Sequence, residues 1–400
     1  MNKTVETTLS GSPLGADAPF DTSRLDALME ASGIDALIVS SQHNLRYLLN
    51  GYRFFFFAHA SAIGVGRYVP LLVYQRGHAA RTLYVGIRTE QNERDLGALW
   101  APEFVSAWYG EGAAQAAIAH LKKLGIERGR IGIERAFLAA DAEEALRAGL
   151  PHAQFSDALR LLERYRAVKT PKELAILRDS SEKVVDAMLA VIGAHGPGAS
   201  TAELTEALRR EETNRGLEFD YCLIAAGKSH NRAPSEKLIW GEGDVLSLDS
   251  GASYKGYIGD LTRMAIHGEP DAELEDLLAH IDDIQQAARK PIRAGALGKA
   301  IYVEAEALLR KSPHANILEF VAHGMGLVSH EAPRLTSSGP IPYRGDYADQ
   351  PLEAGMVLSI ETTLLHPRGF IKLEDTVVVT ANAWEAFGDG GRGWNRGGTN

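Results

Sequence analysis

The second half of the chain repeats one pattern that few soluble folds can accommodate: an acidic or imidazole side chain lies in or at the end of an apolar, strand-like run. One such run leads from Val245 to Asp249, and another leads from Met356 to Glu361. A carboxylate buried alone is costly, so it either loses its charge or finds cations. The pattern therefore predicts that distant strands bring these side chains together. The residues concerned are Asp249, Asp260, His323, Glu361 and Glu374.

The two aspartates fit a β-hairpin. Asp260 follows Asp249 by eleven residues, and the turn-forming Gly251 and Gly256 lie between them. Two strands joined by such a turn would bring the two carboxylates close together. Taken singly, an acid at a strand end is more often a surface or turn residue, and His323 could be a structural histidine. Five such residues in similar contexts favour a functional site.

The charge of this group predicts bound metal. Four carboxylates and one imidazole carry more negative charge than one basic residue can balance, whereas two divalent cations would balance it. Oxygen-rich ligation with one imidazole suits manganese, iron, cobalt or zinc, and the ligand types do not choose among them. Two ions about 3.5–4 Å apart would hold a bridging hydroxide and polarise a carbonyl, which is the chemistry of a hydrolase.

Composition narrows the other classes of function. The chain has 52 acidic and 42 basic side chains, a net charge of −10, which argues against a nucleic-acid partner. No run approaches the roughly 20 apolar residues of a membrane span. The single cysteine, Cys222, excludes a disulfide framework and fits a reducing compartment. Residues 1–20 lack the basic-then-apolar pattern of a signal peptide, so we expect a flexible leader on a cytoplasmic protein.

The order of predicted elements indicates two domains. Strand-like and helix-like segments alternate over residues 21–162, which predicts an α/β domain. The sequence Thr170-Pro171-Lys172-Glu173 then predicts a helix start, because threonine can cap a helix and glutamate can complete a capping box. We expect a catalytic domain over residues 163–385, which opens with two helices. The Gly-rich residues 386–400 are expected to form a mobile or docking tail.

The sequences around the five residues resemble the creatinase/prolidase/aminopeptidase P family of pita-bread metallohydrolases. The resemblance implies an α/β N-terminal domain plus an α+β pita-bread C-terminal catalytic domain. It also implies a homodimer and Xaa-Pro dipeptidase or aminopeptidase activity on a dipeptide or other small molecule. Residues 33–39 and 44–48 resemble the family's N-terminal domain. The matching catalytic motifs are Asp249-Ser250-Gly251, Asp260-Leu261-Thr262-Arg263, His323-Gly324-Met325-Gly326-Leu327, His330-Glu331-Ala332-Pro333-Arg334, Ser359-Ile360-Glu361 and Glu374-Asp375-Thr376.

Carried over residue by residue, the resemblance implies a role for each of the five. Asp249 would chelate the first ion, and Asp260 and Glu374 would bridge both ions. His323 and Glu361 would complete the shell of the second ion. Glu361 would also carry the proton from the water to the leaving nitrogen, since a carboxylate that touches both ion and water is within proton-transfer reach. Manganese is the first expectation for the two ions, with iron, cobalt or zinc as alternatives.

Two further histidines are implied to act on the substrate. His230 and His330 match the family's substrate-side histidines and could donate hydrogen bonds to the substrate carbonyl or to the oxyanion. The alternative for His230 is a solvent-facing loop residue. Tyr257 and Arg334 are candidates to line the cleft, although no sequence signal separates them from packing residues.

The chain also departs from the peptidase pattern. Thr362 and Thr363 follow Glu361 where peptidases commonly have Pro-Gly, and Lys372 stands where they commonly carry arginine. Lysine is a point charge without the guanidinium fork. These changes keep an alternative open: a non-peptidase member acting on a small charged metabolite, by creatinase- or ectoine-hydrolase-like C–N hydrolysis or as a sulfonium lyase. A third possibility is a binding module, like relatives that have lost their metal-ligating residues and bind partners. The complete set of five candidate ligands disfavours it.

The run from Phe54 to Phe57 is unusual. We favour a buried core segment or a strand buried on both faces; the alternative is a loop that faces the substrate or a subunit. In creatinase-type relatives the N-terminal domain of one subunit reaches the active site of the other. This resemblance makes Arg53, Phe55 and His59 candidates for substrate selection.

Overall fold

The computed structural model describes residues 17–59, 62, 64, 68–335 and 345–399, and the chain divides into two compact units. The first unit is Met1–Tyr165 and the second is Arg166–Asn400, a division close to the boundary expected after residue 162. Residues 1–16 of the expected leader lie outside the described residues. Phe20, at its end, packs edge-on against Tyr74 and Trp100, so it belongs to the first unit's core.

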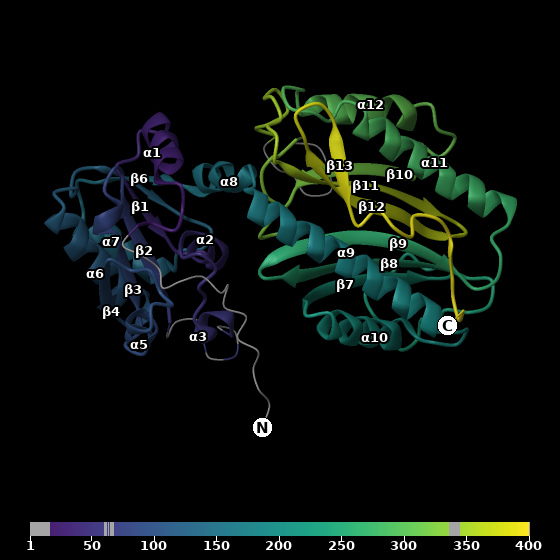
Figure 1. Cartoon of the computed structure of the whole chain (residues 1–400), viewed down its shortest axis with the longest axis horizontal. Helices are drawn as coiled ribbons and strands as arrows, with labels where there is room; N and C mark the ends of the chain where they lie inside the picture. The colour runs from purple at the N-terminus through teal and green to yellow at the C-terminus, as the bar shows by residue number, and fades with distance from the viewer. Residues whose placement is uncertain (1–16, 60–61, 63, 65–67, 336–344, 400) are drawn as a thin grey trace. The chain divides into compact units, whose positions relative to one another are not determined.

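The first unit is built on a mixed sheet with the strand order β4-β3-β2-β1-β5-β6 (Figure 1). β1 pairs in parallel with β5 and antiparallel with β2. The strands are β1 (Ala36–Val39), β2 (Leu71–Gln75), β3 (Leu83–Gly86), β4 (Glu103–Ser106), β5 (Arg130–Ile133) and β6 (Gln154–Asp157). The helices are α1 (Thr22–Ala31), α2 (Gln42–Leu48), α3 (Phe55–Ala58), η2 (Ala79–Arg81), α5 (Glu90–Asp95), α6 (Tyr109–Lys123) and α7 (Ala140–Gly149), and α8 (Leu159–Ala167) crosses into the second unit.

Helices cover both faces of this sheet, as an α/β domain requires. Successive residues of β1 point to opposite faces. Ile38 packs with residues of α6 and α7, whereas Leu37 and Val39 pack with residues of α1, α2 and α8. The predicted α/β class is therefore confirmed.

The four-phenylalanine segment differs from the expectation of a buried strand. Residues Phe55–Ala58 form the short helix α3, and the four side chains do not share one environment. Phe54 is 6% exposed and packs with Tyr68, whereas Phe55 is 56% exposed. A helical turn points consecutive side chains in different directions, so this run cannot be buried as one strip.

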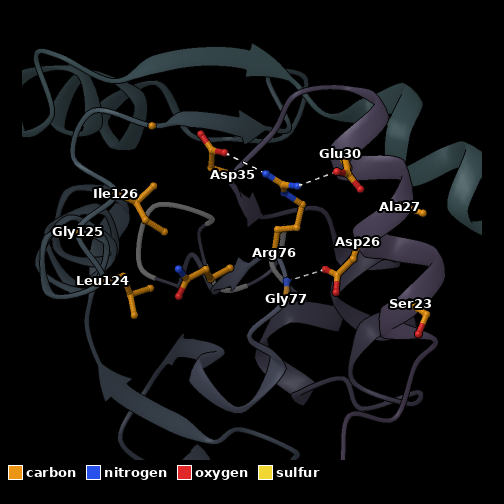
Figure 2. A pocket seen from close by; sticks show the side chains of 12 residues that line it. Ser23, Asp26, Ala27, Glu30, Asp35, Arg76, Gly77, Leu124, Gly125 and Ile126 are labelled. Carbon is orange, nitrogen blue, oxygen red and sulfur yellow. Dashed lines mark hydrogen bonds and ion pairs between the residues drawn. The ribbon is translucent and has the colours of Figure 1, made fainter.

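A polar pocket of the first unit lies beside α1 (Figure 2). Arg76 lies 3.9 Å from the Glu30 carboxylate and 3.4 Å from the Asp35 carboxylate. Asp26 accepts a hydrogen bond from the backbone N–H of Gly77. The predicted site residues are absent from its described lining, so this pocket is not part of the predicted site.

The second unit is built on a large sheet with the order β10-β11-β12-β9-β8-β7, on which helices pack (Figure 1). β13 pairs with β12, and β14 pairs with β9. The strands are β7 (Glu218–Ala226), β8 (Val245–Tyr254), β9 (Tyr257–Ile266), β10 (Leu318–Gly324), β11 (Val357–His366), β12 (Gly369–Val379), β13 (Trp384–Phe387) and β14 (Asn395–Arg396). The helices are α9 (Pro171–Ala194), α10 (Thr201–Asn214), α11 (Ala272–Arg289) and α12 (Lys299–Leu309).

The helix start predicted at Thr170 is confirmed, and the two helices expected at the beginning of this unit are present. Thr170 and Glu173 form a reciprocal capping box at the start of α9, and Ser200 and Glu203 form another at α10. Helices α9 and α10 pack on β7–β9, and α11 and α12 pack on β10–β12. The helices therefore cover one face of the sheet and leave the other face for polar side chains.

The C-terminal segment differs from the mobile alternative expected for it, because it docks on the second unit of its own chain. β14 pairs in parallel with β9, and Trp394 is buried and donates a hydrogen bond to the carbonyl of Leu274. The Arg392 guanidinium contacts the buried carboxylate of Asp375. The Gly-rich sequence gives no sign of this docking. Arg392 contacts Asp282 and Trp394 contacts Leu274, and each partner lies more than a hundred residues earlier in the chain.

Candidate metal centre

The two aspartates lie on a β-hairpin, as predicted. β8 and β9 pair antiparallel, and the Tyr254–Tyr257 pair is the one next to the turn. Lys255 and Gly256 form the turn, with φ values of 49° and 87°. Gly251 lies opposite Asp260 in this register. Both φ values are positive, and a two-residue turn of this kind matches the twist of the strands. The hairpin therefore places both carboxylates on one face.

The other three residues reach the same face from neighbouring strands. Glu361 of β11 lies opposite Glu374 of β12, and His323 of β10 lies opposite Ser359. The pair of Thr262 and Glu374 joins the two halves of the sheet. Because side chains alternate along a strand, the neighbours of these polar residues point to the helices. Those neighbours include Leu248, Leu261, Ile360 and Leu373, all fully buried.

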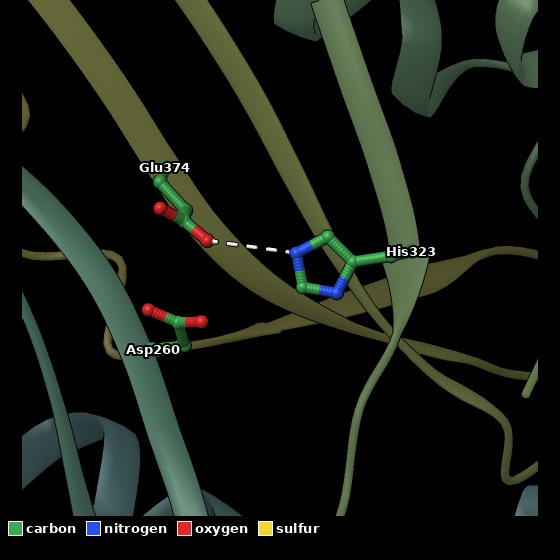
Figure 3. A group of neighbouring side chains, drawn as sticks. All are labelled: Asp260, His323 and Glu374. Atoms are coloured by element: carbon green, nitrogen blue, oxygen red, sulfur yellow. Dashed lines mark ion pairs between the residues drawn. The ribbon is translucent and has the colours of Figure 1, made fainter. Parts of the chain in front are cut away.

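Asp260, His323 and Glu374 form a group that fits one metal ion. Their ligand atoms lie within 4.8 Å of one another, and Figure 3 shows the three side chains pointing toward a common centre. His323 Nε2 is buried and has no hydrogen-bond partner among the described residues. It lies 3.9 Å from Glu374 and 3.7 Å from Glu361, too far for a hydrogen bond. An unpartnered ring nitrogen facing carboxylates is what a divalent ion would satisfy.

Lys372 fills the neighbouring space. Its buried ammonium lies 2.8 Å from Asp249, 2.6 Å from Glu361 and 2.7 Å from Glu374. Asp249 is also contacted by the guanidinium of Arg232. The residues present therefore fit a second ion beside Asp249 only if Lys372 moves away.

Neighbouring charges explain why Lys372 and Glu374 are both ionised. Burial alone would lower the pKa of Lys372, but the carboxylates of Asp249, Glu361 and Glu374 raise it well above its ordinary value. Burial alone would raise the pKa of Glu374, but the Lys372 ammonium and the His323 ring lower it to about 2. The Lys372–Glu374 pair is therefore ionised at neutral pH.

The remaining carboxylates are less well compensated by the protein. Burial, and then the carboxylates of Glu374 and Asp249, raise the pKa of Asp260 well above its ordinary value. A hydrogen bond from Tyr221 offsets this only in part. Burial likewise raises the pKa of Asp249 and of Glu361 although both contact Lys372. Without a cation, these carboxyl groups therefore favour their protonated form, and a bound cation would favour their ionised form.

His330 lies next to the candidate ligands, as the resemblance implies. Its ring stacks on His323 with centroids 3.8 Å apart and an interplanar angle of 16°. Burial, and then the adjacent His323, lower the pKa of His330 to about 3, so its imidazole is neutral at pH 7. The next residue, Glu331, is buried and lies 2.8 Å from Arg166 and 2.9 Å from Lys169. This ion cluster fixes the segment that carries His330.

The other predicted residues of the second unit interact with residues other than the five candidate ligands. His230 is exposed, and its Nε2 hydrogen bonds with the carbonyl of His366. Tyr257 donates a hydrogen bond to Glu173, the residue that completes the capping box of α9. Arg334 is half-buried and acts electrostatically on His330. Arg53, Phe55 and His59 belong to the first unit, whereas the carboxylates belong to the second.

The sequence does not identify Arg232 and Tyr221 as part of the site, and it does not reveal the contacts that Lys372 makes there. Arg232 and Tyr221 contact Asp249 and Asp260 but carry no motif that marks them. In the sequence, Lys372 stands out only as a departure from the family pattern. A signal was available, because Lys372 and Glu374 are two residues apart in a strand and therefore share a face.

Comparisons with known proteins agree with this geometry. Residues 175–381 match the family described as Metallopeptidase family M24, and residues 22–168 match the Creatinase/Prolidase N-terminal domain. The chain is 26% identical over 371 residues to an uncharacterized peptidase, YqhT, of Bacillus subtilis, covering 90% of this chain and 95% of that protein. It is 26% identical over 225 residues to the Xaa-Pro dipeptidase of Pyrococcus furiosus, covering 54% of this chain and 62% of that protein.

A solved structure of a dipeptidase from Pyrococcus horikoshii OT3 superimposes with a TM-score of 0.75 and 25% identity, covering 92% of this chain and 97% of that one. Within the described ranges, no helix is both long enough and apolar enough to cross a bilayer.

Proposed function

Because the chain belongs to metallopeptidase family M24, whose members use divalent metal ions, we propose that this metallohydrolase cleaves the bond before proline in Xaa-Pro dipeptides. The convergence of Asp260, His323 and Glu374 on one buried point carries the proposal. The similarity to the Xaa-Pro dipeptidase of Pyrococcus furiosus supports the substrate class. A bound divalent ion supplies Lewis-acid polarisation and lowers the pKa of water.

The chain's own residues then have distinct tasks. Glu361 lies on the rim of the cluster, held 2.6 Å from Lys372 Nζ, and we assign it the transfer of a proton to the leaving nitrogen. His330 is neutral, so one ring nitrogen carries a proton that can be donated to the developing oxyanion. Asp249 keeps Lys372 and Arg232 in place. The exposed position of His230 gives it at most a role in contacting bound substrate.

The finer features of the function are proposals of the same kind. We propose manganese as the resident metal, a cytoplasmic location and a homodimer, on the resemblance to the family and on the composition. The two-ion form of the reaction stays a prediction from the sequence. A dipeptide is a small partner, in keeping with a net charge of −10 that disfavours nucleic acid.

A second candidate is hydrolysis of a C–N bond in a small charged metabolite. One observation favours it: Lys372 and Arg232 contribute fixed positive charge to the cluster whether or not metal is bound. This charge partly balances the carboxylates without an ion, as a hydrolysis that needs no metal would require. This candidate shares the fold and most of the site, so substrate preference must decide between the two.

The test uses the purified full chain, stripped with EDTA and reloaded with manganese, cobalt or zinc. We expect the reloaded protein to cleave Ala-Pro faster than Ala-Gly and creatine, and Asp260→Asn to lose both activity and metal. The matched control Asp276→Asn, an exposed residue of α11, should keep both. No cleavage of any Xaa-Pro dipeptide by fully loaded protein would contradict the proposal, and turnover of creatine-like substrates alone would favour the second candidate.

A further inference from the structure

Lys372, in the carboxylate cluster, has one carboxylate neighbour for each N–H donor of its ammonium group. An ammonium carries three N–H donors and no acceptor. Lys372 Nζ lies 2.6–2.8 Å from one oxygen of each of three carboxylates, those of Asp249, Glu361 and Glu374. The lysine is itself 4% exposed, so water does not compete for these contacts. This arrangement puts a positive charge at the point shared by three candidate ligands.

Strand pairing holds the lysine there. Lys372 lies in the middle of β12, where its neighbour Thr363 on β11 fixes the register. Glu361 and Glu374 face each other two pairs further along, and therefore on the same face of the sheet. Moving the ammonium out of the cluster would leave a buried charge unpaired, which is costly. A second ion would therefore have to displace a well-held partner.

The charge of the cluster, counted over side chains in contact, leaves room for one divalent ion. Asp249, Asp260, Glu361 and Glu374 contribute four negative charges when ionised. Lys372 and Arg232 contribute two positive charges in direct contact with Asp249. The difference is two negative charges, which one divalent cation balances. The sequence alone suggested two cations because it did not reveal that two basic side chains reach the cluster.

The other half of the cluster offers the position for that ion. Asp260, His323 and Glu374 bring their ligand atoms within 4.8 Å of one another. His323 Nε2 is buried without a hydrogen-bond partner among the described residues. Among the described residues, Lys372 forms ion pairs with Asp249, Glu361 and Glu374, so Glu374 is the residue that the two halves share. The two halves of the cluster therefore differ: one has a built-in cation and the other has an unpartnered ligand.

We infer that this chain binds one divalent cation rather than two, at Asp260, His323 and Glu374, and that Lys372 Nζ takes the place of the second ion. The inference rests on the proposed metal-dependent function and deepens it. Asp249, which the family pattern assigns to the first ion, becomes the anchor of Lys372 and Arg232. Removal of metal by a chelator then leaves half of the cluster's positive charge in place.

The experiment measures metal stoichiometry on the full chain. Protein stripped with EDTA is dialysed to equilibrium against micromolar MnCl₂, and bound manganese per chain is measured by mass spectrometry. Electron paramagnetic resonance then separates a single Mn²⁺ from a spin-coupled pair. We expect one manganese and an uncoupled signal for the wild type. Lys372→Met, which keeps the side-chain length without the charge, should bind two and show coupling. Lys299→Met, an exposed lysine of α12, is the matched control and should bind one.

Asp249→Asn keeps the test decisive should Lys372→Met fail to fold. Under the inference this variant still binds one manganese, since Asp249 contacts Lys372 rather than an ion. Under a two-ion arrangement the same variant falls from two to one. Two coupled ions in the wild type would overturn the inference and leave the proposed hydrolysis intact. One ion without cleavage of any Xaa-Pro dipeptide would overturn the proposed function and leave the inference standing, and no bound metal would overturn both.

Discussion

Glu374 and Asp375 are consecutive residues of β12, and their carboxylates lie on opposite faces of the sheet. Glu374 contacts Lys372 in the candidate metal centre. Asp375, on the helix side, lies 2.9 Å from Arg263 and 2.8 Å from Arg289, and it also contacts Arg392 of the C-terminal segment. One strand thus carries a site residue and, beside it, the centre of a buried ion cluster that holds the C-terminal segment to the sheet.

Asp375→Asn should destabilise the protein without removing the metal site. The substitution removes the anion that the buried guanidinium groups of Arg263 and Arg289 share, and breaking a buried ion pair on one side costs about 3–5 kcal/mol. The free energy of unfolding in urea measures the loss. The exposed Asp276→Asn on α11 is the control and should change it by less than about 0.5 kcal/mol. Unchanged stability in Asp375→Asn would show that the arginines are not paired as described.

His330→Ala should lower turnover and leave the metal in place. Loss of one hydrogen-bond donor to a developing oxyanion typically costs about 10²–10³ in kcat. His330 stacks on His323 and is not one of the three side chains that form the candidate metal group, so metal content should stay near the wild-type value. Steady-state kinetics on Ala-Pro and elemental analysis measure the two quantities. His152→Ala, an exposed histidine of the first unit, serves as control. Parallel loss of metal and activity would instead make His330 a ligand.

Glu331→Gln should act on both stability and turnover. The amide removes the charge shared by the buried Arg166 and Lys169, so we expect a loss of about 3–5 kcal/mol in the free energy of unfolding. Because His330 is the preceding residue, kcat should fall as well. Glu319→Gln, an exposed residue of β10, is the matched control. Full stability with reduced kcat would mean that Glu331 acts on substrate and not as an anchor.

Glu212 should make stability depend on pH. It is buried on α10 beside Ser250, and burial raises its pKa to about 8 from a usual value near 4.5. Between these two values the folded protein keeps a proton that the unfolded chain releases. Stability therefore falls as pH rises from about 4.5 to about 8 and is constant above, at about 1.4 kcal/mol for each pKa unit.

Glu212→Gln should remove this dependence. Metal-free protein is unfolded in urea at pH 5 and pH 8.5, and the variant should gain stability over the wild type by several kcal/mol more at the higher pH. The exposed Glu206→Gln on the same helix should show no such change. An equal difference at both pH values would mean that Glu212 is ionised throughout.

Several features of the structure depend only on residues close together in the sequence, and these features could be predicted from it. The capping boxes at Thr170 and Ser200 depend on a glutamate three positions on, and the Asp249–Asp260 hairpin depends on a short glycine turn. The alternation of polar and apolar residues on the strands shows which side chains share a face. Helix starts, the hairpin and the shared face of the five candidate residues follow from such short-range patterns.

Other features depended on which distant side chains meet. Arg232 and Lys372 supply the cations beside Asp249, and Arg392 docks the C-terminal segment on Asp375. None of these pairings follows from local spacing, because a charge acts through space on whatever the fold brings near. Residue types along the chain were enough to locate a buried cluster of carboxylates. How many ions that cluster needs is set by the basic side chains that packing delivers to it, since burial makes each unbalanced charge costly.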